Sequence, residues 1–287
     1  MKLPETEGNS YLMKKDLMKP DLIKDAVIIS QPAPHVAQVA INRPEAKNAI
    51  DEKTRLALIE AIQSVLADPD VRALVLCGTE GIFCAGGDLT SMRGMSEQQA
   101  RARMQSGHQL VNLLWQAEIP VVVALEKYAI GAGAGLALLA DYMIAGKNAR
   151  MSFPFMQLGL VPDWGSTQAL IRRTGWSTAK RLILDKASLK GQQLLELNIA
   201  DKIVEDESVL QTACNKAADF THYPRLAFRL FKTRMQTYPE SFGDALNAEE
   251  NDQTACFLGA EFEEGLSALQ QKRSPDFINN PNEINKK

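Results

Sequence analysis

Apolar residues along the chain recur at two spacings, one typical of strands and one of helices. Short apolar runs predict strands at 26–41 (two strands flanking a Pro-rich turn), 71–78, 119–125, 141–146 and 149–153. Apolar positions at helical spacing predict helices at 51–66 and 97–116. Strands that alternate with helices in this way indicate an α/β core of repeated ββα or βα units.

After residue 166 the pattern is almost entirely helical. The predicted helices cover 166–174, 177–186, 188–196, 206–220, 223–237 and 240–270. We therefore expect an N-terminal arm at 1–25, an α/β core at 26–200 and a helical C-terminal lobe at 201–287. The lobe has more apolar faces than one monomer surface accommodates, so we expect it to bury some of them against a neighbouring subunit.

Composition and charge narrow the function classes. The 287 residues, 45% hydrophobic and 23% charged, suffice for one large core plus a smaller lobe. A formal net charge of −3 provides no global positive field, so nucleic acid and anionic membranes are not expected partners. No run is long and apolar enough to span a bilayer, so we expect no membrane association.

Cysteine and histidine usage favours a metal-free protein in a reducing compartment. The four cysteines and three histidines form no CxxC or Cys/His cluster, so no metal site is predicted. Cys77 and Cys84 lie in apolar runs and are expected to be buried thiols. Residues 1–25 contain no Arg and no uninterrupted apolar core, which argues against a targeting signal. We expect a cytoplasmic location.

Two glycine-rich turns, GIFCAGGDL (81–89) and YAIGAGAGLALLAD (128–141), each follow a predicted strand and precede a helical pattern. Glycines allow close backbone approach, and a helix N-terminus leaves N–H groups unpaired, so such turns suit an anionic oxygen. The glycines of the second turn do not follow the G-x-G-x-x-G spacing, which argues against a dinucleotide site. Tight helix packing through small residues explains the second turn equally well, and both explanations can hold.

The stretch LGLVPDWGST (158–167) places one carboxylate, Asp163, in an apolar segment. Pro, Asp and Gly are ordinary turn residues, and Asp163 could cap a helix that begins near Ser166. The alternative is a catalytic carboxylate, because partial burial beside Val161 and Trp164 would raise its pKa. The stretch alone leaves both open.

Five ordered segments together resemble the enoyl-CoA hydratase/isomerase, or crotonase, family. They are INRPEAKNAI (41–50), FCAGGDL (83–89), YAIGAGAGLALLADYMIA (128–145), LGLVPDWGSTQAL (158–170) and EEGLSALQQKRSPDF (263–277). The resemblance spans about residues 26–277. It implies a crotonase-type ββα spiral core with a C-terminal helical lobe, an acyl-CoA substrate, no cofactor other than that CoA thioester, and a homotrimer or dimer of trimers.

The resemblance also assigns roles to residues. The backbone N–H groups of Gly87 and Ala132 would bind the thioester carbonyl and stabilise an enolate. Trp164 would line the acyl pocket, and Lys272 would lie near the CoA phosphates. The CoA-binding positions that it implies are Lys47, Ala49, Ala85, Gly87, Asp88, Leu89, Thr90, Trp164 and Lys272. Lys47 is explained equally well as a solvated lysine in a turn.

Departures from the family pattern separate the activities. Hydratases of this family use two glutamates, and here those positions are Gly135 and Phe155. Asp163 matches the single acid of several isomerases, so the sequence predicts an acyl-CoA isomerase. A hydratase or another lyase with a different acid, and a non-catalytic acyl-CoA-binding scaffold, remain alternatives. Glu126 is expected to be a surface or subunit-contact residue.

Several basic residues of the second half are expected to be solvated by default. They are Arg172, Arg173, Lys232, Lys272 and Arg273.

Overall fold

The computed structural model describes residues 22–24, 26–237 and 241–279. A seven-stranded sheet has the order β1 (Leu22–Lys24), β2 (Val27–Ala33), β3 (Val36–Ile41), β4 (Ala73–Gly78), β5 (Val121–Leu125), β7 (Tyr142–Gly146), β10 (Lys202–Val204). Strands β1 to β3 are antiparallel, and β3 to β10 are parallel neighbours. A smaller sheet contains β6 (Tyr128–Ile130), β8 (Arg150–Ser152) and β9 (Ser188–Lys190).

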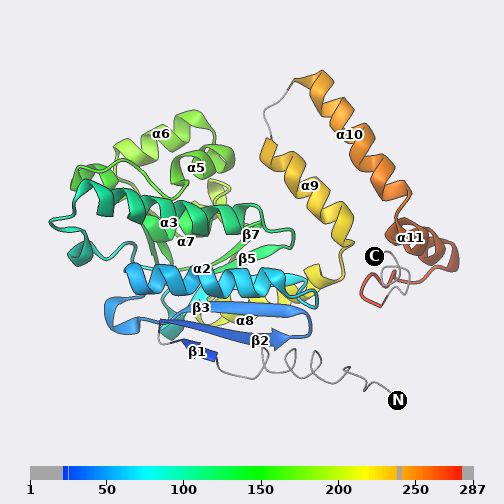
Figure 1. The fold of residues 1–287 in the computed structure, drawn as a ribbon, viewed down its shortest axis with the longest axis horizontal. Helices are drawn as coiled ribbons and strands as arrows, with labels where there is room; N and C mark the ends of the chain where they lie inside the picture. The colour runs from blue at the N-terminus through cyan, green and yellow to red at the C-terminus, as the bar shows by residue number, and fades with distance from the viewer. Residues whose placement is uncertain (1–21, 25, 238–240, 280–287) are drawn as a thin grey trace, which may run out of the picture.

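Helices cover both faces of the large sheet (Figure 1). They are α2 (Glu52–Ala67), α3 (Glu97–Trp115), α4 (Ala132–Leu138), α5 (Ser166–Thr174), α6 (Trp176–Leu184), α7 (Gly191–Glu196), α8 (Val209–Thr221), α9 (Arg225–Thr237), α10 (Phe242–Phe257) and α11 (Ala260–Gln271). Single 3-10 turns lie at Pro44–Ala46, Thr79–Gly81, Leu89–Met92, Pro154–Leu158 and Asp206–Ser208.

Side chains that alternate along the strands build two cores. In β4, Leu74 and Leu76 belong to the core shared with α2, whereas Val75 and Cys77 belong to the core shared with α8. Successive strand residues point to opposite faces, and this strand is buried on both, which explains its unbroken apolar run. The predicted burial of Cys77 and Cys84 is confirmed, since both are at most 1% exposed.

Most predicted elements form, with two differences. The segment 188–196 was expected to be one helix, but it begins with β9, which pairs with β8, before α7 starts. The expected helix 240–270 is divided into α10 and α11, because Gly259 has an extended backbone and is the N-cap of α11. Cross-strand pairing decides the first case, and such pairing is not visible in local periodicity.

The packing does not follow the expected boundary at residue 200. Strand β10 pairs with β7, and α8 covers the sheet, so both belong to the core. The elements that leave the sheet begin with α9, and α10 and α11 extend farther from it (Figure 1). Of the expected arm, residues 1–21 and 25 lie outside the described residues, whereas 22–24 form β1 and pair with β2.

Two basic residues expected to be solvated, Lys232 and Arg173, are held against the core, whereas Arg172 is exposed. Lys232 of α9 is only 7% exposed, and its Nζ lies 2.7 Å from Oδ2 of Asp141. Arg173 donates hydrogen bonds to the carbonyls of residues 138 and 140, at the C-terminal end of α4, and to the carbonyl of residue 199. Arg172 lies over the Trp115 ring at 5.3 Å. The expectation is wrong for Lys232 and Arg173, because each satisfies polar groups that would otherwise be buried without partners.

The helices and the possible metal ligands are considered for the described residues 22–24, 26–237 and 241–279. None of their helices is long and apolar enough to cross a membrane. No three His, Cys, Asp or Glu side chains in the same part of the chain are grouped so that they could hold a metal ion.

Candidate active site

The two glycine-rich turns lie against each other. Parallel bridges join Ile50 to Gly87 and Cys84 to Ala129, so the first turn is bound to the segments on both sides. A Cβ atom at Gly133 would lie 2.6 Å from the carbonyl oxygen of Cys84. Gly86 has a φ of +100°, and its Cβ would lie 2.5 Å from the carbonyl oxygen of Ile130. Close packing therefore requires glycine at both positions.

Two N–H groups at this junction are left without backbone partners. Within the described residues, neither Gly87 nor Ala132 donates a backbone hydrogen bond. In the bridge, the N–H of Ile50 donates to the carbonyl of Gly86, and the N–H of Asp88 donates to the carbonyl of Ile50. The N–H of Gly87 takes part in neither bond. A Cβ atom at Gly86 would lie 3.9 Å from the nitrogen of Ala132, so the two donors belong to one small region. They are the donors that the family resemblance implies.

The predicted CoA-binding segment is built onto the first turn. The carbonyl of Lys47 accepts a hydrogen bond from the N–H of Ala85 at 3.0 Å, and the Lys47 side chain is exposed. Asp88 accepts hydrogen bonds from Thr90 and from Arg43 Nη1, which lower the pKa of its carboxyl to about 2. The Asp88 carboxylate therefore holds the shape of this turn.

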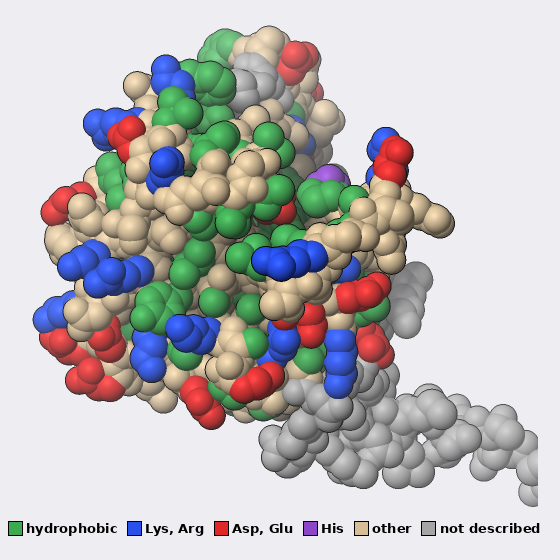
Figure 2. Space-filling model, turned by 90° about the vertical axis from the view of Figure 1, so that its left-hand side faces the viewer, with side chains coloured by type: hydrophobic (Ala, Val, Ile, Leu, Met, Phe, Trp, Pro, Cys, Tyr) green, Lys and Arg blue, Asp and Glu red, His purple; other side chains and the backbone are tan. Residues whose placement is uncertain are grey.

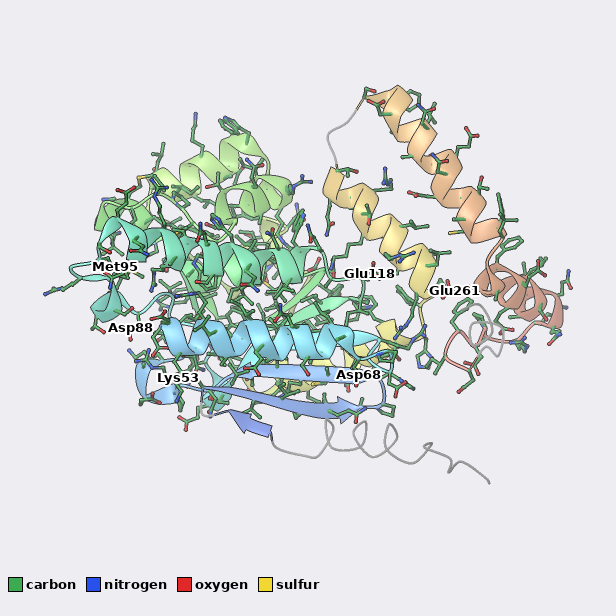
Figure 3. The ribbon with its side chains drawn as sticks, in the orientation of Figure 1. Lys53, Asp68, Asp88, Met95, Glu118 and Glu261 are labelled. Atoms are coloured by element: carbon green, nitrogen blue, oxygen red, sulfur yellow. The ribbon has the colours of Figure 1, made fainter. Side chains whose placement is uncertain are left out.

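Of the remaining predicted CoA-binding positions, three lie beside the first glycine turn and Lys272 lies far from it. Ala49, Leu89 and Thr90 adjoin the same turn, and their contacts with CoA stay a prediction. Lys272 ends α11, which lies at the opposite end of the molecule from Asp88 (Figure 3, where Glu261 marks α11). Within one chain, Lys272 does not reach the glycine turns.

Asp163 occupies a tight turn before α5. Trp164 and Gly165 both have left-handed backbones, and the carbonyl of Asp163 accepts a hydrogen bond from the N–H of Ser166 at 3.0 Å. The Asp163 side chain does not cap the helix, because Gly165 is the N-cap and makes no side-chain bond. Helix capping thus does not account for the carboxylate.

The Asp163 carboxylate is largely enclosed. Its Oδ1 is buried and has no hydrogen-bond partner in the described part of the chain. Burial raises the pKa of Asp163, while nearby Arg103 acts in the opposite direction. An enclosed carboxylate with an unpaired oxygen and a raised pKa is suited to accepting a proton.

The two positions that carry glutamates in hydratases are closed by packing. A Cβ atom at Gly135 would lie 3.0 Å from both the Cβ and the carbonyl oxygen of Trp164. Trp164 is 3% exposed, and its ring also packs on Gly107 of α3. Phe155 is 4% exposed. A glutamate at position 135 would therefore displace the turn that carries Asp163.

The sequence interpretation missed two arginines near this site, Arg103 of α3 and Arg55 of α2. A Cβ atom at Gly87 would lie 2.9 Å from Nη2 of Arg103. The available signal was helical spacing: Arg103 precedes Gly107 by four residues and so shares the face of α3 that meets Trp164. Arg55 gave a second signal, as a charged residue at a core-facing position of α2.

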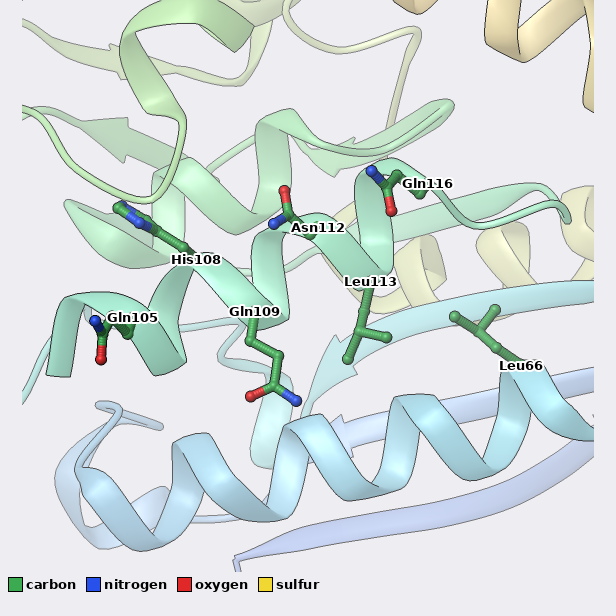
Figure 4. A pocket seen from close by; sticks show the side chains of 7 residues that line it. All are labelled: Leu66, Gln105, His108, Gln109, Asn112, Leu113 and Gln116. Atoms are coloured by element: carbon green, nitrogen blue, oxygen red, sulfur yellow. The ribbon is translucent and has the colours of Figure 1, made fainter. Parts of the chain in front are cut away.

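A separate groove of about 560 Å³ lies beside α3 (Figure 4). Its lining residues are Leu66, Gln105, His108, Gln109, Asn112, Leu113 and Gln116. At 100° per residue, Gln105, Gln109 and Gln116 project from the side of α3 opposite Gly107. These three glutamines therefore face away from the glycine turns, although His108, which also lines the groove, is close enough to Asp163 to act on the pKa of that carboxyl.

Known proteins resemble this chain over most of its length. The family model for enoyl-CoA hydratase/isomerase matches residues 32–280. The chain is 31% identical to crotonyl-CoA hydratase of Syntrophomonas wolfei, over 88% of this chain and 97% of that protein. It is 32% identical to 1,2-epoxyphenylacetyl-CoA isomerase of Escherichia coli, over 87% and 97%. The crystal structure of an enoyl-CoA hydratase from Bacillus anthracis superposes with a TM-score of 0.83 at 25% identity, covering 87% of this chain and 98% of that one.

The fold and the matched segments define an α/β protein of the crotonase type. The chain belongs to the enoyl-CoA hydratase/isomerase family, as its five segments indicated. The names of its relatives include both hydratases and an isomerase.

Proposed function

We propose that this protein is an acyl-CoA isomerase that moves a proton between carbons of an unsaturated or cyclic acyl-CoA. The observation that carries the proposal is Asp163, an enclosed carboxylate with an unpaired Oδ1 beside Trp164. The close packing at Gly135 supports it further, since a glutamate there, as in hydratases of the two-glutamate type, would require Trp164 to shift. The substrate is the CoA thioester itself, and the mechanism uses no other cofactor.

In the proposed mechanism Asp163 removes a proton from a carbon adjacent to the thioester or to the double bond. The electron pair of that C–H bond moves into the acyl group, and negative charge develops on the thioester oxygen. The N–H groups of Gly87 and Ala132 stabilise that oxygen, and they do so more strongly in the transition state than in the ground state. Asp163 then returns the proton to a different carbon, so that the double bond has moved and the atoms balance.

Binding of CoA is proposed for the segment that begins at Lys47 and for the turn 85–90. Lys and Arg side chains lie among hydrophobic and acidic ones on the face that carries this end of the molecule (Figure 2). A ligand with phosphates at one end and an apolar chain at the other suits such a surface.

Asp163→Asn tests the proposal, with Asp185→Asn as a matched control at an exposed position. A panel of 3-enoyl-, 2-enoyl- and ring-bearing CoA thioesters identifies the substrate, and deuterium uptake from D2O follows the proton transfer. We expect Asp163→Asn to lower turnover by about 100-fold or more, the usual scale for a general acid–base group. Binding of the CoA ester and the behaviour of Asp185→Asn should be unchanged.

The pH profile provides a second readout. Because burial raises the pKa of Asp163, the ionised base is lost as the pH falls through a value above about 3.9, the ordinary pKa of Asp. The turnover rate of the wild type should therefore fall at low pH with an apparent pKa above that value. The residual activity of Asp163→Asn should not show this fall.

Full activity of Asp163→Asn on the true substrate would overturn the proton-shuttle role. The similarity to crotonyl-CoA hydratase makes hydration the second candidate function. Hydration of a short 2-enoyl-CoA at about 10 per second, an ordinary enzyme rate, would favour a hydratase that uses another acid.

A further inference from the structure

The guanidinium group of Arg103 lies at the reactive end of the proposed site. Its Nη2 is 2.9 Å from the position that a Cβ atom of Gly87 would occupy, next to the proposed oxyanion donor. Its Nη1 is 3.5 Å from Oγ of Ser91, the outer limit of a hydrogen bond. Arg103 also lies close enough to Asp163 to lower the pKa of that carboxyl. Arg103 thus lies within reach of both groups that would handle the acyl chain.

A second arginine, Arg55, lies behind the first. Its side chain extends from α2 toward α3, where its Nε donates a hydrogen bond to Oγ of Ser106 at 2.6 Å. The residue is 3% exposed, and its Nη1 is buried with no hydrogen-bond partner in the described part of the chain. The positive charges of Arg55 and Arg103 are close enough to interact repulsively.

The charge around these arginines is not balanced by the protein. In the described ranges, neither Arg55 nor Arg103 has a carboxylate oxygen within 4 Å. Asp51 and Glu52 act on Arg55 only over a longer distance, and Asp51 accepts a hydrogen bond from the N–H of Thr54. Arg103 is only partly buried, whereas Arg55 is buried. A buried guanidinium without an ionic partner is costly, so the charge of Arg55 behind Arg103 favours an anionic ligand at this place.

We propose that Arg103, supported by the charge of Arg55, binds a carboxylate of the substrate's acyl group close to the thioester. The substrates would then be CoA half-thioesters of short dicarboxylic acids. This inference rests on the proposed acyl-CoA function and narrows its substrate class. A guanidinium presents two parallel N–H donors to a carboxylate, a geometry that an acyl chain ending in a methyl group leaves unpaired.

The location of Arg103 favours an acyl carboxylate over a CoA phosphate. Arg103 lies over Gly87, at the thioester end of the proposed site, whereas the phosphates are assigned to the segment of Lys47. Asp163 is the adverse charge nearby. Burial raises the pKa of Asp163 and so favours its neutral form, which weakens the repulsion between Asp163 and a substrate carboxylate.

Saturated thioesters test recognition separately from catalysis, because they have no double bond to move. Calorimetry measures the affinity for glutaryl-CoA against pentanoyl-CoA and for adipyl-CoA against hexanoyl-CoA. The affinity for free CoA shows whether a variant affects binding of the CoA phosphates. We expect the dicarboxylic ester of at least one pair to bind about tenfold tighter or more, with a preference that weakens as salt is added. Arg103→Gln should abolish the preference. Arg101→Gln, which removes an exposed arginine paired with Glu97 on the same helix, should keep it.

Two further variants keep the test decisive. Asp163→Asn removes the adverse charge and should maintain or increase the preference for the dicarboxylic ester. Arg55→Lys keeps a positive charge at this position and should keep most of the preference.

Three results would overturn the inference. The first is equal affinity of the wild-type protein for both members of each pair. The second is a preference for the dicarboxylic ester that survives in Arg103→Gln. The third is that Arg103→Gln weakens the binding of free CoA as much as the binding of glutaryl-CoA. The last result would assign Arg103 to a phosphate. A dicarboxylic preference without isomerisation of any unsaturated thioester would instead refute the proposed function and leave the recognition intact.

Discussion

Removal of Lys232, one partner of the ion pair between α9 and the core, should destabilise the protein strongly. Lys232 Nζ lies 2.7 Å from Oδ2 of Asp141, and the same oxygen accepts a hydrogen bond from the N–H of Val121 at 2.8 Å. Lys232→Met keeps most of the side-chain volume but leaves the Asp141 carboxylate buried without its counter-ion. The loss of one partner of a buried pair costs about 3–5 kcal/mol of unfolding free energy.

Urea unfolding and thermal melts measure this loss. For a chain of this size each kcal/mol shifts the melting temperature by about 2–4 °C, so Lys232→Met should lower it by roughly 6–20 °C. Lys147→Met is the matched control, because Lys147 pairs with Glu205 on the surface. Exposed pairs contribute about 0–1 kcal/mol, so that variant should melt within a few degrees of the wild type. All proteins are compared at one concentration, since assembly would shift the apparent stability.

The pH dependence tests the electrostatic cause. Burial raises the pKa of Asp141, and Lys232 partly offsets this effect, so removal of Lys232 raises the pKa further. A carboxyl with a raised folded-state pKa destabilises the fold when ionised, and this penalty disappears as the pH falls through that pKa. The difference in unfolding free energy between Lys232→Met and the wild type should therefore become smaller at low pH. The double variant Asp141→Asn with Lys232→Met should lose less stability than the sum of the single variants.

A loss below about 1 kcal/mol for Lys232→Met would mean that the pair behaves like a surface pair, contrary to its burial. A loss of several kcal/mol that does not change with pH would assign the effect to packing of the lysine stem, and the electrostatic explanation would fail.

Two further predictions concern the glycine turn and the assembly. Gly135→Glu should displace the Asp163 turn, because the Cβ atom of the new side chain would lie 3.0 Å from Trp164. The variant should isomerise 3-enoyl-CoA at least tenfold more slowly than the wild type. It should not hydrate 2-enoyl-CoA. Hydration by that variant at about 10 per second would contradict this steric argument. The apolar side chains of Phe242, Leu258 and Leu269 are 75–79% exposed in one chain, so light scattering at micromolar concentration should give about three or six times the 31.6 kDa chain mass. A stable monomer that binds acyl-CoA would refute this assembly.

The sequence by itself determined the features that depend on local spacing. The run ALVLCG became β4, and Asp51 caps α2 through the N–H of Thr54 at the predicted start of that helix. The glycine turns were also visible, because a backbone that approaches within 2.6 Å of a Cβ position admits no larger residue. The family followed from the order of these segments, and the comparisons confirm it.

The tertiary structure decided whatever depends on contacts between distant segments. Lys232 and Arg173 have ordinary helical patterns, yet each is buried by a partner or by carbonyls many residues away. Arg55 and Arg103 lie 48 positions apart by their numbers, and only the packing of α2 on α3 brings their charges together. Side-chain periodicity reports which face of an element is apolar, but not which element covers that face. Burial of charge, and with it the electrostatics of the site, is fixed only when the elements pack.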